Sequence, residues 1–251
     1  MSDDAVTLAV DGAVARLTFN RPEVLNAGDP RWVADLTRAT RALADDQKVR
    51  VVVMSGAGRA FQTGVDLGSL ARGELRFEHL HEWEDAMTAI ERMDKLVIAA
   101  INGHCLGGGL QLALVCDYRL AVADALLGLP AVKECLVPSM ALYRLPRLIG
   151  VARAQELILT GRSITAAEGE RYGLVNRVVA AADFSRAVDE TVDAFLALPP
   201  TSVGVSKRLV TQAFDLPFDE FRRRMEEGLR ACLASDDHRA AMDAIRARRR
   251  G

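Results

Sequence analysis

Residues 102–112 read NGHCLGGGLQL, and this stretch is the most informative one for the fold. The apolar run from Leu96 to Ile101 predicts a buried strand before it, and the apolar segment from Leu110 to Cys116 predicts a helix after the glycines. Glycines at a strand-to-helix junction let another group approach the backbone closely. The first amides of a helix have no intrahelical partner and lie at its positive end. They are therefore suited to bind a carbonyl oxygen that gains negative charge.

A second segment also consists of a short apolar run followed by a glycine-containing stretch. Residues 50–55 form another short apolar run, and GAGRAFQTGVDL follows at residues 56–67. Together the two segments resemble the crotonase superfamily, also called the enoyl-CoA hydratase/isomerase family, whose patterns are SGxGxAFxAGxDL and NGxxxGGGxELALxCD. The resemblance runs from Asn20 through essentially the whole chain. It continues in LGLP at 127–130, RLPRLIG at 144–150, LTGR at 159–162 and YGLVNRVV at 172–179.

The organisation of the chain fits an α/β protein. Strands alternate with helices in the first half, and helix follows helix from about Val151. The resemblance implies a crotonase-like spiral of ββα units over residues 1–195 and a helical oligomerisation region over 196–251. The expected strands are Val6–Val10, Ala13–Phe19, Val49–Met54, Leu96–Ile101 and Tyr118–Ala123. The expected helices are Pro30–Ala44, Phe77–Met93, Leu110–Cys116, Phe218–Ala234 and His238–Arg249. Asp29 is the expected N-cap of the first of these helices.

Composition excludes several classes of function. Half of the 251 residues are hydrophobic, and the net charge of -2 gives no general attraction to nucleic acid. The four cysteines have neither CxxC nor disulfide-framework spacing. There is no N-terminal apolar segment typical of a secretory leader, and no apolar run of about 18 residues. We expect a cytoplasmic protein that does not span a membrane.

The resemblance implies an oxyanion hole. In the family, two backbone amides polarise a thioester carbonyl, and the matching positions here are Val65 and Gly108. Abstracting a proton beside a thioester, or adding a nucleophile at its β-carbon, puts charge on that oxygen, which such donors stabilise. Thr63 and Val65 are bulkier than the usual alanines, where the family packs adenine. A positive φ at the β-branched Val65 would be strained.

The resemblance also implies a CoA channel, with CoA as part of the substrate and no separate cofactor. RPEVLNA at residues 21–27 matches the family's RPxxLNA, and Arg21 can meet a phosphate. No phosphate-binding glycine motif of another kind is present, and His79 and His81 are too few for a metal site. The predicted substrate-binding residues are Arg21, Leu25, Ala27, Thr63, Asp66, Leu67, Ala131 and Ser139.

Both glutamates that serve hydratases of the family as general acid and base are replaced. The position after GGGx holds Gln111, and the position after Gly128-Leu129-Pro130 holds Ala131. The aspartate that dienoyl isomerases use falls at Ser139. Gln orients a water or a carbonyl but does not take a proton at neutral pH, and Ala does neither.

Two carboxylates are candidates for the missing acid/base group. Glu84 lies on the expected helix 77–93, near the position from which a dehalogenase-like relative presents a histidine. The alternative is that His81, Glu84 and Asp85 together form a solvated helix face. Glu134 lies three residues beyond Ala131, where a period-two alternation would turn it away from the pocket. Tyr143 is a weaker candidate.

These features support two functions of different kinds. The first is an enzyme that acts on an acyl-CoA or acyl-carrier-protein thioester through an enolate, by isomerisation, decarboxylation or elimination. The second is a non-catalytic acyl-CoA binding protein of the same fold, and a scaffold that binds no thioester is a third reading. The apolar stripe Phe218, Phe221, Met225, Leu229 and Cys232 predicts a trimer or hexamer, and the basic run Arg246, Arg248, Arg249 and Arg250 is either a frayed tail or a contact for a CoA phosphate.

Overall fold

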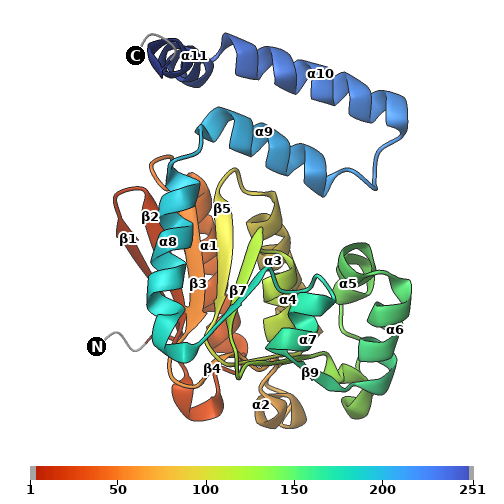
Figure 1. Ribbon diagram of the computed structural model, residues 1–251. Helices are drawn as coiled ribbons and strands as arrows, with labels where there is room; N and C mark the ends of the chain where they lie inside the picture. The colour runs from red at the N-terminus through yellow and green to blue at the C-terminus, as the bar shows by residue number, and fades with distance from the viewer. Residues whose placement is uncertain (1–3, 249–251) are drawn as a thin grey trace.

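A computed structural model describes residues 4–248, and Figure 1 shows a central sheet flanked by helices. The strand order of this six-stranded sheet is β1-β2-β3-β5-β7-β10. β1 and β2 form an antiparallel hairpin, and the other neighbours pair in parallel. The strands are β1 (Val6–Asp11), β2 (Val14–Phe19), β3 (Val51–Gly56), β5 (Leu96–Ile101), β7 (Tyr118–Val122) and β10 (Arg177–Val179).

A second sheet has four short strands in the order β4-β6-β8-β9. They are β4 (Ala60–Gln62), β6 (His104–Leu106), β8 (Leu126–Gly128) and β9 (Ser163–Thr165). Each of three successive units gives one strand to the large sheet and the next to the small one: β3 and β4, β5 and β6, β7 and β8. This confirms the predicted α/β spiral. The three-residue strands themselves were not predicted, because they are too short to show a periodicity.

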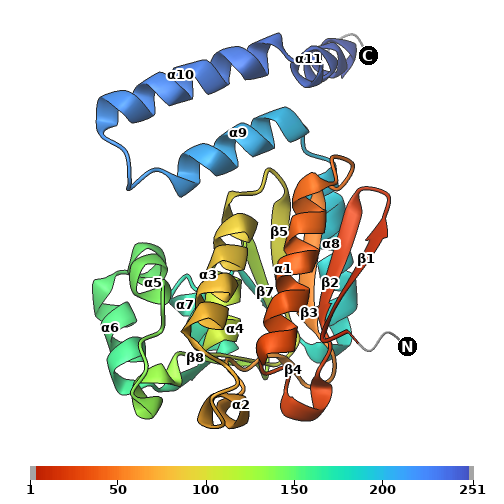
Figure 2. The same cartoon turned by 180° about the vertical axis from the view of Figure 1, so that it is seen from behind.

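Helices cover both faces of the large sheet. α1 (Pro30–Asp45) and α3 (Phe77–Arg92) lie side by side on one face, and α8 (Phe184–Leu196) lies on the other (Figures 1 and 2). Alternate β3 residues serve the two faces: Val52 and Met54 join the core under α1 and α3, while Val51 and Val53 join the core under α8. Burial on both faces explains why the strands read as continuous apolar runs.

The long elements agree with the sequence. Asp29 caps α1, since its carboxylate accepts a hydrogen bond of 2.8 Å from the backbone N–H of Trp32. α3 ends one residue earlier than expected, and α4 (Gly108–Leu114) begins at Gly108, two residues earlier than expected. The remaining elements of the core are α2 (Leu67–Ala71), α5 (Ala141–Ile149), α6 (Val151–Thr160), α7 (Ala166–Arg171) and the 3-10 helices η1 (Pro22–Val24), η2 (Pro130–Glu134) and η3 (Ala181–Asp183).

Three helices end the described chain. They are α9 (Pro200–Thr211), α10 (Phe218–Ala234) and α11 (Asp236–Arg248), and α10 lies along α9 on the side away from the sheets (Figure 1). No residue of α10 or α11 is buried. Of the predicted basic run, Arg249 and Arg250 lie outside the described residues. Within residues 4–248, no helix is both long and apolar enough to cross a membrane.

Candidate active site

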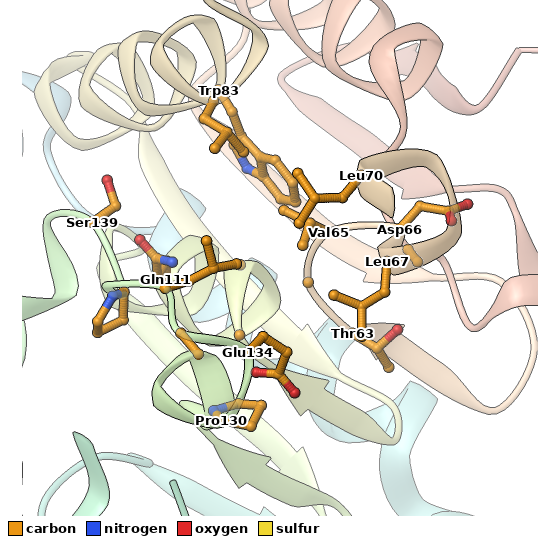
Figure 3. Close-up of a pocket in the computed structure, with 18 of the residues that line it drawn as sticks. Thr63, Val65, Asp66, Leu67, Leu70, Trp83, Gln111, Pro130, Glu134 and Ser139 are labelled. Atoms are coloured by element: carbon orange, nitrogen blue, oxygen red, sulfur yellow. The ribbon is translucent and has the colours of Figure 1, made fainter. Parts of the chain in front are cut away.

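A cavity of about 420 Å³ opens between the start of α4, α3 and the segment after β8 (Figure 3). In that view Thr63, Val65 and Leu70 lie on one side of it, and Gln111, Glu134 and Ser139 on the other. The residues that line it are Val24, Ala27, Thr63, Gly64, Val65, Asp66, Leu67, Leu70, Leu80, Trp83, Met87, Gly107, Gly108, Gln111, Pro130, Ala131, Glu134, Leu136, Val137, Pro138 and Ser139.

Val65 and Gly108, the predicted oxyanion-hole residues, both line this cavity. Neither N–H has a hydrogen-bond acceptor among residues 4–248. Gly108 is the first residue of α4, so its N–H is one that the helix itself leaves unpaired. The two loops press together, because a Cβ added to Gly64 would lie 3.3 Å from the Gly108 nitrogen. Two donors without an acceptor among the described residues therefore belong to residues that line the same cavity.

The strain expected at Val65 is absent. Gly64 adopts the left-handed backbone instead, with a φ of 95°, and Val65 is not among the described residues with positive φ. The hydroxyl of Thr63 donates to the carbonyl of Leu25 at 3.1 Å, so its polar end is satisfied within the wall. The bulkier side chains of this loop are therefore accommodated without distortion of the Val65 backbone.

Trp83 fixes the glycine loops from above, and the sequence analysis did not identify it. Its ring packs so closely that a Cβ on Gly28 or Gly108 would come within 2.8 or 2.7 Å of its atoms. Trp83 is 3% exposed, and its ring centroid lies 4.5 Å from that of Trp32. Its indole N–H has no hydrogen-bond partner within residues 4–248. A side chain at position 108 would therefore press on the Trp83 ring, which would have to shift.

The two positions that resemble the catalytic glutamates both line the cavity. Gln111 lies one turn into α4, and Ala131 lies in η2. The side-chain oxygen of Gln111 is buried and has no hydrogen-bond partner in the described part of the chain. Ser139 also lines the cavity, with a φ of 40°. The structure therefore brings together Gln111, Ala131 and Ser139, none of which carries a carboxylate.

Glu84 is committed to an ion pair. One carboxylate oxygen lies 2.7 Å from the guanidinium of Arg144, and the other accepts a hydrogen bond of 3.0 Å from Ser139. Arg144 is 7% exposed on its side chain and also pairs with Glu91 at 3.0 Å. Burial opposes the charge on Arg144, but the hydrogen bonds and charges of Glu91 and Glu84 outweigh it and raise the pKa of Arg144. Glu84 does not line the cavity.

Glu134 lines the cavity and is exposed. Its segment is a 3-10 helix, so the period-two alternation that would have turned it away does not apply. Its carboxylate has no hydrogen-bond or ion-pair partner among residues 4–248, in contrast to Asp66. Asp66 caps α2 by accepting from the Ser69 N–H at 3.0 Å, and its other oxygen pairs with Arg21 at 3.3 Å.

Two of the predicted CoA contacts lie outside the cavity lining. The Arg21 guanidinium pairs with Asp29 at 3.2 Å and with Asp66, and it donates to the Ala27 carbonyl at 2.6 Å. Its charge is therefore paired with two carboxylates, and its contact with a CoA phosphate stays a prediction. Leu25 contributes only its carbonyl, which supports Thr63. The other predicted substrate-binding residues line the cavity. No group of at least three His, Cys, Asp or Glu side chains suited to a metal ion occurs in the described part of the chain.

Comparison with known proteins gives a consistent result. The profile of the enoyl-CoA hydratase/isomerase family matches residues 9–250. The chain is 37% identical over 231 residues to (E)-benzylidenesuccinyl-CoA hydratase from Thauera aromatica, covering 85% of each chain. It is 31% identical over 246 residues to the short-chain-enoyl-CoA hydratase of Clostridium acetobutylicum, covering 96% of this chain and 94% of that one. The crystal structure of an enoyl-CoA hydratase from Bacillus anthracis superposes with a TM-score of 0.91 at 29% identity, covering 97% and 96% of the two chains.

The two sheets joined by repeated ββα units, with the cavity at the start of α4, define a protein of the crotonase fold. The chain belongs to the enoyl-CoA hydratase/isomerase family.

Proposed function

We propose that this protein acts on an acyl-CoA thioester through an enolate-type intermediate held by the amides of Val65 and Gly108. The observation that carries the proposal is the pair of N–H groups without an acceptor, brought to one cavity by two loops in close contact. The names of the relatives, which are hydratases of CoA thioesters, support this class of substrate.

The chemistry requires such a pair. Removing a proton beside a thioester carbonyl moves negative charge onto the carbonyl oxygen. Donors that are already oriented stabilise that charge without reorganising, and loss of one typically costs about 100- to 1000-fold in rate. The Gly108 N–H adds the positive end of α4 to the same place.

Calorimetry with acetyl-CoA and free CoA tests this donor pair. We expect acetyl-CoA to bind more tightly, and Gly108→Pro, which lacks the N–H, to lose the preference. Gly108→Ala is the matched control, because it brings a Cβ toward the same Trp83 ring but keeps the donor. Equal affinities of the unaltered protein for both ligands would show that no anion hole operates.

The proposed reaction is not simple hydration of an enoyl thioester. Gln111 and Ala131 leave no acid/base pair to activate a water at neutral pH. Glu134 is the cavity carboxylate that no described residue engages, so it is our candidate to move a proton during isomerisation, decarboxylation or elimination. Loss of a general base typically costs about 100- to 10,000-fold in rate.

Turnover of a panel of acyl-CoA thioesters, followed by mass spectrometry, tests this assignment. We expect one member to be converted and Glu134→Gln to abolish the conversion while acetyl-CoA binding stays unchanged. Binding of thioesters with no turnover of any would instead favour the second candidate function, a non-catalytic acyl-CoA binding protein. The specific observation in favour of that alternative is the absence of a carboxylate at both Gln111 and Ala131.

We also propose self-association through α10. Phe218, Leu229 and Leu233 are 78%, 53% and 55% exposed in the single chain. An apolar stripe of this kind is expected to be covered. A trimer or hexamer by light scattering supports the proposal, and a monomer at micromolar concentration contradicts it.

A further inference from the structure

The side chain of Gln62, the last residue of β4, is fully buried beneath the cavity loop. Its oxygen accepts a hydrogen bond of 2.7 Å from the N–H of Gly64, and its nitrogen donates one of 2.9 Å to the carbonyl of Gly64. Gln62 does not line the cavity, so it does not touch a ligand there. We propose that Gln62 is a positioning residue that sets the direction of the Val65 N–H.

The reason lies in the planarity of the peptide bond. The carbonyl of Gly64 and the N–H of Val65 belong to one trans peptide, so the oxygen and the hydrogen point in opposite directions. The carbonyl oxygen has two anchors, the Gln62 nitrogen at 2.9 Å and the Gly28 N–H at 2.8 Å. Fixing the oxygen on the protein side therefore directs the Val65 N–H away from both anchors. A carbonyl that accepts two hydrogen bonds also polarises its own N–H, which strengthens that donor.

The two hydrogen bonds from the Gln62 side chain matter because the residue they hold, Gly64, is a glycine. Gly64 has a φ of 95°, which glycine adopts readily and other residues rarely do. A residue of this freedom lets the peptide on either side rotate. Gln62 holds both peptides at once, one through the N–H and one through the carbonyl of Gly64.

Gln62 also links the two donor loops. A Cβ on Gly109 would lie 2.0 Å from the Gln62 backbone oxygen and 2.9 Å from its side-chain oxygen. The glycine triplet that supplies the Gly108 amide is thus packed directly on the residue that orients the Val65 amide. This inference rests on the proposed anion hole and assigns the residue that maintains its geometry.

The test measures the carbonyl stretch of bound acetyl-CoA, labelled with ¹³C at the thioester carbon, by infrared spectroscopy. Polarisation by the two amides lowers this frequency relative to free acetyl-CoA. In Gln62→Leu and Gln62→Met, which fill the site without hydrogen bonds, we expect the frequency to return toward the free value. We expect the preference for acetyl-CoA over CoA to fall up to about tenfold, while the affinity for CoA itself stays within about twofold.

A matched control separates positioning from general destabilisation. Asn102→Leu also removes hydrogen bonds to a neighbouring turn, at 3.0 Å from the Gly56 N–H and 2.9 Å to the Gly56 carbonyl, but none to Gly64. We expect this variant to lose stability and keep the full frequency shift. Rescue is expected in Gln62→Glu at a pH low enough to protonate its carboxyl, since the O–H then donates to the Gly64 carbonyl.

The outcomes distinguish the two proposals. If unaltered protein shows neither the shift nor the preference, the anion hole itself is wrong. If unaltered protein shows both and a folded Gln62→Leu or Gln62→Met keeps both, the role of Gln62 is overturned while the hole stands. If neither variant folds, a frequency shift in Gln62→Glu that does not depend on protonation overturns it equally.

Discussion

Two parts of the cavity wall, the glycine loops and the segment of residues 130–139 opposite them, differ in how deeply they are buried. The loops at Gln62–Asp66 and Gly107–Gly109 are backed by the core, with Trp83 on one side and the buried Gln62 beneath. The segment at 130–139 is mostly exposed, with Val132 and Val137 at 43% and 76%. Cys135 and Ser139 within it have positive φ.

This difference in burial indicates which groups of the site can change without a loss of stability. Donors built from backbone in a packed core cannot be removed without disturbing the core. Side chains on an exposed segment change without such a cost, since surface substitutions usually alter stability by less than about 0.5 kcal/mol. Ala131 lies on the exposed segment, and the proposed donors Val65 and Gly108 lie on the loops backed by the core. Gln111 lines the cavity from α4, so its side chain can also change without loss of a backbone donor.

Trp83→Ala is expected to have the largest effect. Truncating a buried Trp costs about 3–5 kcal/mol of unfolding free energy, and the lost ring would also release Gly28 and Gly108. Urea unfolding measures the change. Phe77→Ala on the same helix is the control, because Phe77 is 75% exposed and its loss should stay within about 0.5 kcal/mol. Similar losses in both variants would break the contrast between core-backed and exposed residues.

Substitution of the two candidate carboxylates, Glu84 and Glu134, should change the free energy of unfolding by different amounts. Glu84→Gln weakens a partly buried pair with Arg144, and we expect a loss of about 1–2 kcal/mol with turnover kept within about twofold. Glu134→Gln should change stability by less than about 0.5 kcal/mol. Urea unfolding and the thioester panel give the two readouts. A stable Glu84→Gln variant without turnover would transfer the proton chemistry to Glu84.

The smallest expected effect is a difference in thiol reactivity between the cysteines of the two parts of the cavity wall. Cys105, next to the glycine triplet, is fully buried, and burial raises its pKa well above the usual value. Burial likewise raises the pKa of Cys116 to about 12, so both remain protonated at pH 8. Cys135, on the opposite segment, is exposed. A thiol reagent in native buffer should modify Cys135 and reach Cys105 and Cys116 only after unfolding, as peptide mass mapping would show. Rapid labelling of Cys105 would mean that the glycine loops open in solution.

The sequence predicted the long elements and the cavity because both leave local patterns. Continuous apolar runs identified β3 and β5, and the glycine triplet located the strand-to-helix junction, although α4 begins inside the triplet rather than after it. Trp83 was missed because an apolar residue on an amphipathic helix has the same pattern whether it packs on a sheet or on a glycine loop. The pairing of Arg21 with Asp29 and Asp66 was missed because these residues are far apart in sequence. The position of Glu134 was undetermined because a short apolar and charged segment does not distinguish a strand from a 3-10 helix.

Hydration of crotonyl-CoA by the unaltered protein tests the central claim most directly. The claim is that the anion-binding side of the site is present while Gln111 and Ala131 leave it without the acid/base pair for hydration. A rate near the uncatalysed background is the predicted result, and Gln111→Glu with Ala131→Glu should raise it detectably. Robust hydration by the unaltered protein would contradict the account, because it would require an acid/base pair that neither Gln111 nor Ala131 supplies.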